Sequence, residues 1–301
     1  MKISDRDFLE KKRPKETLDV HLKDYELVMS HYNKTIKKDQ NNTDAYVNLG
    51  FLCLDKEDFD GALRCFQKIV ELEPDNPESF NNLGYVYERM DMLDSAKKNY
   101  EKALEIDPSC MESILNIGHI LELQGDYHRA VAQYGKAILN HPEAASPRFC
   151  LAVLYDRHDM YDEAAEEYLK ILKINPEHIK AAYNLGRIYC QLGNYQDAIE
   201  KFEKVLQLDP RHADAWNNMG SVYESQKDFP KAIEAYRRAL SINPFHEETN
   251  VNLSYIQYLT FKAHPDKINK SDVIRRLHFV LSLNPHNKKV YKLLGLMENT
   301  T

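Results

Sequence analysis

Apolar residues recur along this chain at helical spacing, in a unit that is copied many times. The clearest copy begins at Trp216, passes through Gly220 and Tyr223, and continues through Ala232 to Pro244. A large apolar residue followed by glycine and tyrosine at helical spacing is typical of an amphipathic helix with a small-residue notch. The alanine belongs to a second helix, which the proline closes. Each copy therefore predicts a pair of helices.

Four columns of residues keep an interval of 34 positions, as from Pro74 to Pro108. The columns are the prolines Pro74, Pro108, Pro142, Pro176, Pro210 and Pro244; the notches Gly50, Gly84, Gly118, Ala152, Gly186 and Gly220; the alanines Ala62, Ala96, Ala130, Ala164, Ala198 and Ala232; and the aromatics Phe66, Tyr100, Tyr134, Tyr168, Phe202 and Tyr236. A sustained period of this length indicates a solenoid, because one helix pair cannot bury both of its faces alone. We expect the small residues to let paired helices approach closely and the aromatics to fill the space between pairs.

The order of residue types in each unit resembles the tetratricopeptide repeat. The second unit carries that pattern as Phe80, Leu83, Gly84, Tyr87, Ala96, Tyr100, Ala103 and Pro108. The resemblance covers residues 43–301. It implies an all-α fold in which antiparallel helix pairs wind into a right-handed superhelical solenoid, and the first helix of each pair lines a concave groove.

The columns predict the domain organisation. Residues 1–20 are expected to form a flexible charged tail and residues 21–42 an N-terminal capping helix. Six repeat units follow over 43–246, then a seventh over 247–287 that carries a seven-residue insertion, and a partial eighth unit of one helix over 288–301.

Two places depart from the pattern. Pro147 stands near the start of the fourth unit, where a large apolar residue is expected, so its first helix is predicted to start late. The insertion in the seventh unit predicts a long basic loop over 261–272 between its two helices.

Composition narrows the function. The net charge is −7, which disfavours nucleic acid or an anionic membrane surface as the partner. No apolar run is long enough to span a membrane, and the first residues do not form a secretion signal. The five cysteines show no paired spacing, which is typical of thiols in a reducing compartment, so a cytoplasmic location is expected.

No catalytic, cofactor-binding or metal-binding motif is present in the sequence. Gly135 and Lys136 lack the glycine-rich loop that holds phosphate, and the dispersed histidines have no zinc-ligand spacing. We therefore expect a non-enzymatic protein with no cofactor and no metal, which acts as a scaffold or adaptor for other proteins.

The candidate binding residues form a column of asparagines two positions before the notch. They are Asn48, Asn82, Asn116, Asn184, Asn218 and Asn252, with Cys150 at the one interruption. A row of side-chain amides can bond the backbone of an extended peptide without selecting its side chains. This asparagine column resembles the one in the repeat domain of O-linked N-acetylglucosamine transferase. The other interpretation is that each amide bonds a neighbouring repeat.

Aromatic and charged residues flank the column. Tyr85, Phe149, Tyr183, Arg187 and Tyr255 complete the candidate groove. Acidic residues dominate the first three units, so the predicted partner is another protein with an extended, neutral-to-basic segment.

Three alternatives remain at this stage. The chain could be a regulatory or substrate-recruiting subunit of a larger enzyme, secretion or motility assembly. It could be an RNA-binding helical repeat, which the negative charge disfavours. It could also self-associate through the C-terminal helix, where Leu293, Leu296 and Met297 suggest an apolar face.

Overall fold

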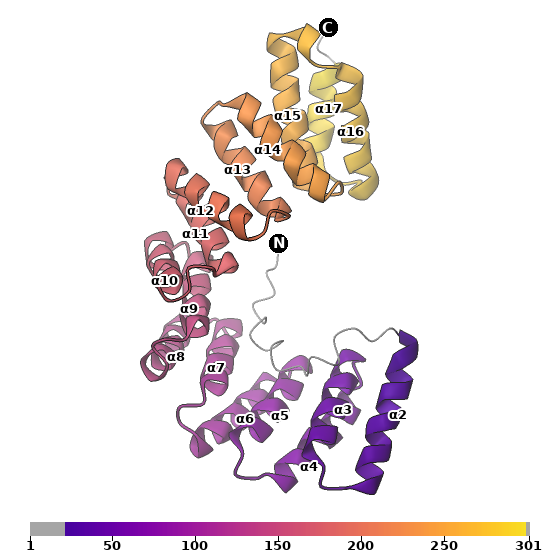
Figure 1. The fold of residues 1–301 in the computed structure, drawn as a ribbon, viewed down its shortest axis with the longest axis vertical. Helices are drawn as coiled ribbons and strands as arrows, with labels where there is room; N and C mark the ends of the chain where they lie inside the picture. Colours follow the sequence, from indigo (N-terminus) through magenta and orange to yellow (C-terminus); the bar gives the residue numbers. More distant parts are fainter. Residues whose placement is uncertain (1–21, 299–301) are drawn as a thin grey trace. The chain divides into compact units, whose positions relative to one another are not determined.

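The computed structural model describes residues 22–298, and every regular element among them is a helix. The chain divides into two compact units, one ending at Leu154 and the other beginning at Tyr155. The helices of the N-terminal unit (Figure 1) are α2 (Leu22–Lys38), α3 (Thr43–Asp55), α4 (Phe59–Leu72), α5 (Pro77–Arg89), α6 (Leu93–Ile106), α7 (Met111–Leu123) and α8 (Tyr127–Asn140). The boundary falls within α9 (Ala145–Arg157).

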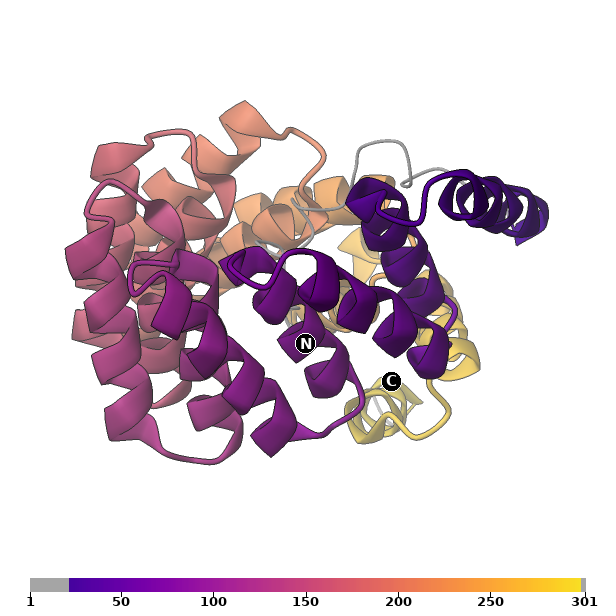
Figure 2. The ribbon, with the colours of Figure 1, turned by 90° about the horizontal axis from the view of Figure 1, so that it is seen from below.

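The C-terminal unit has the same organisation. Its elements are α10 (Tyr161–Ile174), α11 (Ile179–Gln191), α12 (Tyr195–Leu208), α13 (Ala213–Ser225), α14 (Phe229–Ile242), α15 (Glu247–Ala263), the short 3-10 helix η2 (Pro265–Lys267), α16 (Lys270–Leu283) and α17 (Lys288–Glu298). In the N-terminal unit each helix from α2 to α7 packs on the next along the chain, and in the C-terminal unit each α-helix from α10 to α16 does the same. Figure 2 shows this succession in the N-terminal unit, from indigo α2 to purple α6. The predicted all-α class of stacked helix pairs is confirmed.

The first helices of the seven complete units keep the 34-residue register, from Thr43 in α3 to Glu247 in α15. The prediction of a late start in the fourth unit is wrong, because α9 begins at Ala145, in register with the others. Pro147 is its third residue and is buried. The first turn of a helix has no intrahelical acceptor for its N–H groups, so proline breaks no hydrogen bond there.

The notch glycines allow close packing between the two helices of a pair. A Cβ atom built at Gly118 would lie 2.5 Å from Cε1 of Tyr134, and one at Gly50 would lie 2.6 Å from the ring of Phe66. Gly84, Gly186 and Gly220 face the aromatic residues of their own pairs in the same way. The fourth-column aromatics therefore fill space within a pair as well as between pairs. The six alanines of the third column are completely buried.

The hydroxyl of a fourth-column tyrosine has a matching acceptor on the first helix. Tyr236 donates to Glu224 at 2.8 Å and Tyr100 donates to Glu88 at 2.7 Å, while Tyr134 bonds Glu122 in the same manner. Where the column holds Phe66 or Phe202, the acceptor position holds Leu54 or Cys190 instead. A buried or half-buried carboxylate thus occurs with a buried hydroxyl, and leucine or cysteine occurs with phenylalanine, as the need to satisfy buried polar groups requires.

One of these carboxylates makes stability depend on pH. Burial raises the pKa of Glu224 above its usual value of 4.5, although the bond from Tyr236 acts in the opposite direction. Folding then favours the protonated form, so the contribution of Glu224 is greatest below pH 4.5 and is lost as pH rises through the raised pKa. We predict that Glu224→Gln removes this part of the pH dependence. Urea-unfolding midpoints measured from pH 4.5 upward should fall less steeply for the variant, and parallel curves would contradict the assignment.

The turns inside each of the first six pairs share a backbone feature. A residue with positive φ stands at the same point of every one, at intervals of 34. The residues are Glu57, Asp91, Gly125, Asp159, Gly193 and Lys227, with φ between 57° and 77°. Glycine adopts this left-handed conformation without steric cost, yet it occupies only two of the six positions. The other four turns therefore carry strain that the surrounding helix pair must hold.

The seventh unit differs from the predicted arrangement. Helix α15 has 17 residues where the other first helices have 13. The prediction of a long loop over 261–272 is therefore wrong in its bounds. The loop is shorter at both ends, because α15 continues to Ala263 and α16 begins at Lys270. The added turn covers residues 260–263, and Leu259, just before it, packs on the last core cluster.

The two ends of the described chain are covered by single helices. At the N-terminal end α2 packs on the first pair through Met29, Tyr32 and Ile36. At the other end Leu293 and Met297 of α17 are buried in the last core cluster, whereas Leu296 is 39% exposed. Of the three residues in the predicted apolar face, only Leu296 is therefore exposed. The expected tail, residues 1–20, and residues 299–301 lie outside the described part of the chain.

Candidate binding surface

In the N-terminal unit the asparagine column is divided between buried and half-exposed positions. Asn48 on α3 donates to the backbone carbonyl of Asp44, one turn earlier, at 2.9 Å. Asn82 on α5 is half-buried. Asn116 on α7 is buried, and its Nδ2 donates to Oδ1 of Asn81 in the preceding unit at 2.9 Å. Asn116 therefore joins two repeats.

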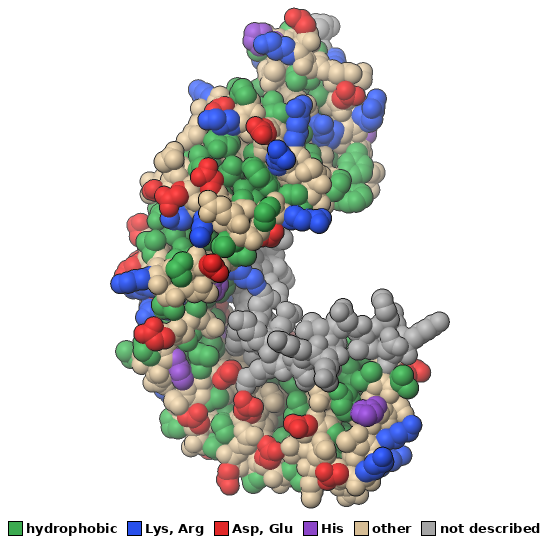
Figure 3. All heavy atoms as spheres, viewed as in Figure 1, with side chains coloured by type: hydrophobic (Ala, Val, Ile, Leu, Met, Phe, Trp, Pro, Cys, Tyr) green, Lys and Arg blue, Asp and Glu red, His purple; other side chains and the backbone are tan. Residues whose placement is uncertain are grey.

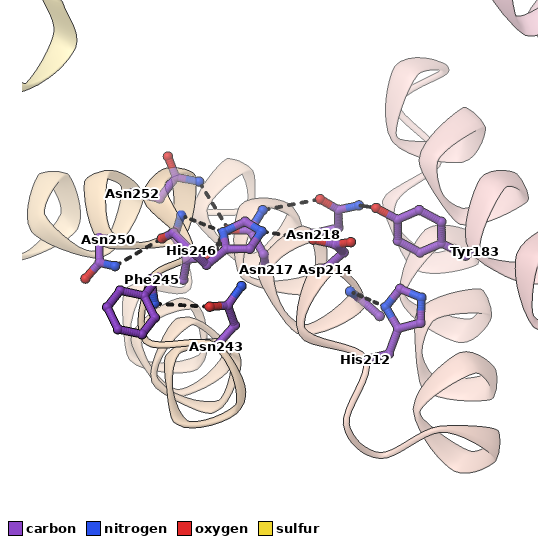
Figure 4. A network of polar contacts seen from close by, with 12 residues as sticks. Tyr183, His212, Asp214, Asn217, Asn218, Asn243, Phe245, His246, Asn250 and Asn252 are labelled. Atoms are coloured by element: carbon purple, nitrogen blue, oxygen red, sulfur yellow. Dashed lines mark hydrogen bonds and ion pairs between the residues drawn. The ribbon is translucent and has the colours of Figure 1, made fainter. Parts of the chain in front are cut away.

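In the C-terminal unit each asparagine of the column donates to the preceding repeat. Nδ2 of the buried Asn184 donates to the Tyr168 hydroxyl at 3.1 Å. Asn218 donates to the Tyr183 hydroxyl at 3.1 Å, and Asn252 contacts Oδ1 of Asn217 at 3.5 Å (Figure 4). Asn218 and Asn252 nevertheless remain half-exposed.

The acceptor in three of these hydrogen bonds is the residue that directly precedes a column position. Asn81, Tyr183 and Asn217 each accept from the asparagine 35 positions later. A hydroxyl 32 positions later reinforces two of them. Ser113 donates to Asn81 at 3.1 Å, and Thr249 donates to Asn217 at 2.9 Å. Tyr183 was predicted as a groove aromatic, but the role of these three residues as acceptors was not identified from the sequence. A search for polar residues at intervals of 35 and 32 would have found it.

A histidine fixes the start of α15 within the same network. The Nδ1 atom of His246 accepts the backbone N–H of Thr249 at 3.2 Å, which caps the helix. Its Nε2 atom lies 2.9 Å from Asp214 of the preceding first helix. The bond to Asp214 raises the pKa of His246, and the same bond lowers the pKa of Asp214. The pair thus ties the N-terminal ends of α13 and α15 together.

The predicted aromatic residues around the column differ in exposure. Tyr255 is 42% exposed, while Tyr85, Phe149 and Tyr183 are half-buried. Burial raises the pKa of the Tyr183 phenol to about 12, and its ring lies 4.9 Å from that of His212. Tyr183 is thus neutral near neutral pH and can accept the bond from Asn218.

The predicted basic residue of the surface already has a partner. The guanidinium of Arg187 lies 3.3 Å from the carboxylate of Asp156. In the N-terminal unit the exposed Asp44 and Glu78 stand in the first turns of α3 and α5. Figure 3 shows acidic side chains spread over the visible surface of this unit.

Stacked helix pairs with small-residue notches define the class of α-helical repeat solenoids. Within this class, profiles of the tetratricopeptide repeat match residues 77–110, 115–179 and 183–247, and a TPR repeat profile matches residues 52–91. Together the matches cover more than half of the chain. The chain belongs to the tetratricopeptide repeat family, whose members are interaction modules that bind other proteins.

Solved structures with the same fold include three instructive cases. YrrB, described as a TPR protein with an unusual peptide-binding site, is 24% identical over 61% of this chain and 95% of its own, with a TM-score of 0.50. A tetratricopeptide repeat protein from Parabacteroides merdae is 19% identical over 89% of this chain and 99% of its own, with a TM-score of 0.57. The Cut9–Hcn1 hetero-tetramer of the APC/C is 18% identical over 91% of this chain and 52% of its own, with a TM-score of 0.59. No curated protein matches by sequence search.

Two further observations concern the described residues. None of the helices between residues 22 and 298 has the length and apolar character required to cross a membrane. Over the same range, no three histidine, cysteine or acidic side chains are grouped closely enough to hold a metal ion.

Proposed function

We propose that this protein is a non-enzymatic scaffold that binds an extended segment of a partner protein along the first helices of its repeats. The observation that carries the proposal is the division of the asparagine column. Asn116 and Asn184 are 2% exposed and are committed to the preceding repeat, whereas Asn48, Asn82, Asn218 and Asn252 keep part of their surface in solvent. Only the half-exposed members are offered as peptide contacts.

The half-exposed asparagines keep unused hydrogen-bonding capacity. A side-chain amide has two N–H donors and an oxygen that accepts twice. Asn252 contacts Asn217 with its nitrogen, and Asn218 uses its nitrogen on Tyr183 while its oxygen accepts from Asn217 at 3.4 Å. The remaining groups can bond the alternating N–H and C=O groups of an extended backbone. Tyr85 and Tyr255 then offer apolar contacts beside that backbone.

The partner segment is expected to be neutral to basic where it meets the N-terminal unit, because Asp44 and Glu78 lie on the first helices there. All five cysteines are free, which favours a reducing compartment such as the cytoplasm. YrrB supports the peptide-binding role through its described peptide-binding site. The Cut9–Hcn1 complex, similar over 91% of this chain, supports the second candidate, a recruiting or regulatory subunit of a larger assembly.

We predict that joint replacement of Asn82, Asn218 and Asn252 by alanine weakens partner binding by about tenfold or more, corresponding to at least ~1.4 kcal/mol. Each amide lost removes bonds to the bound backbone, whereas the half-exposed sites can be solvated by water in the free protein. The partner is first recovered by affinity purification, and its segment is then titrated against the wild-type chain and the variant by calorimetry.

Asn81→Ala is the matched control on the position adjacent to Asn82. Asn81 is buried and accepts from Ser113 and from the buried Asn116, so its loss should cost about 1–3 kcal/mol of folding free energy and leave the affinity of the folded protein unchanged. Unchanged affinity in the triple variant, together with a loss of stability, would show that the whole column serves only to join repeats.

A further inference from the structure

The seventh repeat unit contains a bonded pair of polar side chains, one of them at a position that is apolar or aromatic in the other units. Gln257 stands at the signature tyrosine position of α15 and is 8% exposed. In the other units that position holds Cys53, Tyr87, Leu121, Tyr155, Tyr189 and Tyr223. The Nη1 atom of Arg276 on α16 donates to Oε1 of Gln257. The corresponding positions of the first unit hold Cys53 and Cys65, so the repeat fold itself does not require an arginine here.

Arg276 lacks a counter-ion in the part of the chain that the structure describes. No carboxylate lies within ion-pair distance of it between residues 22 and 298, and the nearby Asp272 is paired with Arg275 at 3.4 Å. Burial lowers the pKa of Arg276, and the charge of Arg237 on α14 lowers it further, although the charge of Asp272 acts in the opposite direction. A partly buried cation beside a second cation is unfavourable until an anion joins them. Arg276 therefore keeps hydrogen-bond donors for an anion that the described residues do not supply within ion-pair distance.

An exposed apolar patch lies beside Arg276. Phe279 follows it by three residues on α16, which places both on neighbouring parts of one helix face. The ring of Phe279 lies 5.9 Å from that of Phe245, which is 64% exposed in the turn before α15. Leu283, one turn after Phe279, is 42% exposed. Figure 3 shows hydrophobic side chains gathered over the end of α16.

The charge of this end of the chain also favours an anionic partner. Residues 251–301 contain eight basic and three acidic residues, although the whole chain has a net charge of −7. The basic residues are Lys262, Lys267, Lys270, Arg275, Arg276, Lys288, Lys289 and Lys292, and the acidic residues are Asp266, Asp272 and Glu298. Long-range attraction therefore guides acidic segments to this end.

We propose that Arg237, Arg276, Phe245, Phe279 and Leu283 form a second docking surface, which binds an acidic segment of a partner protein. A carboxylate of that segment pairs with Arg276 and is attracted by the charge of Arg237, and an adjacent apolar side chain packs on the phenylalanines. A protein segment fits better than a free phosphate or nucleic acid, because exposed aliphatic and aromatic side chains adjoin the cationic pair. This surface lies on α14, α16 and the turn between α14 and α15, separate from the asparagine column.

The test uses the full chain and a short fluorescein-labelled peptide that alternates glutamate pairs with leucine. We expect this peptide to bind about tenfold or more tightly than its counterpart with glutamine in place of glutamate. Arg237→Ala should abolish that difference without shifting thermal unfolding, since Arg237 is exposed. Arg276→Gln should abolish it too, and raised salt should weaken binding of the glutamate peptide.

Arg129→Ala on the N-terminal unit is the matched control, because its side chain is 72% exposed and lies on another unit. This variant should bind the glutamate peptide as the wild type does. Equal affinity for the two peptides, or full binding by Arg237→Ala, would overturn the proposal. Vesicles of phosphatidylserine and phosphatidylcholine serve as a second probe. Binding of vesicles but not of the glutamate peptide would also overturn it, in favour of a membrane surface.

Discussion

Gly118→Ala should lower the free energy of unfolding by about 1–3 kcal/mol, although alanine is the better helix former. The added Cβ would meet Cε1 of Tyr134 at 2.5 Å, a separation that real Cβ atoms do not show. Tyr134 is itself 2% exposed and packed, so its ring cannot move aside without disturbing α8. Urea unfolding followed by circular dichroism measures the change.

Gly135→Ala provides a control in the same repeat with the opposite expected sign. Gly135 lies within α8, and a Cβ there would meet nothing within 4 Å. Removing a helix-interior glycine at an open position should raise stability by about 0.5–1 kcal/mol. If both variants were stabilised, the notch would not be a packing requirement, and the explanation of the glycine column given above would be wrong.

Tyr236→Phe should lower the free energy of unfolding by about 1–3 kcal/mol, although only one oxygen is removed. The change leaves Glu224, whose carboxylate accepts from Tyr236 at 2.8 Å, desolvated and without this donor. The double variant Tyr236→Phe with Glu224→Leu should recover most of the loss, because both polar partners are then replaced by apolar groups.

The first repeat unit is the natural precedent for that double variant, since it pairs Phe66 with Leu54. A double-mutant cycle on unfolding free energies isolates the interaction between the two positions. Additive losses in the cycle would mean that the hydroxyl and the carboxylate act independently, and that the matched occurrence of tyrosine with glutamate has another origin.

Much of the fold could be predicted from the sequence because its determinants recur in phase. The notch, the buried alanine and the aromatic residue each leave a column with its own chemistry, so each tests the others. The left-handed turns left no such column in the sequence. Glu57, Asp91, Asp159 and Lys227 stand at positions where the backbone conformation favours glycine. The start of α9 was mispredicted because a proline in the first helical turn was treated as the helix boundary.

The binding surface was less predictable, because asparagine has two uses. The sequence showed the column but did not show which side-chain amides are hydrogen-bonded to a neighbouring repeat. That depends on the residue one position earlier, where Asn81, Tyr183 and Asn217 act as acceptors across repeats. Arg276 was missed for a related reason, since its significance comes from Gln257 and Arg237 on two other helices.

Side-chain amide NMR on the chain labelled with ¹⁵N-asparagine is the most direct measurement of the proposed binding role. On titration with the recovered partner segment, the amide signals of Asn82, Asn218 and Asn252 should shift. Those of the buried Asn116 and Asn184 should stay, as should that of Asn99, whose amide is bonded to Ser95 on the second-helix side of its pair. Binding of the segment with no shift at Asn82, Asn218 and Asn252 would contradict the account.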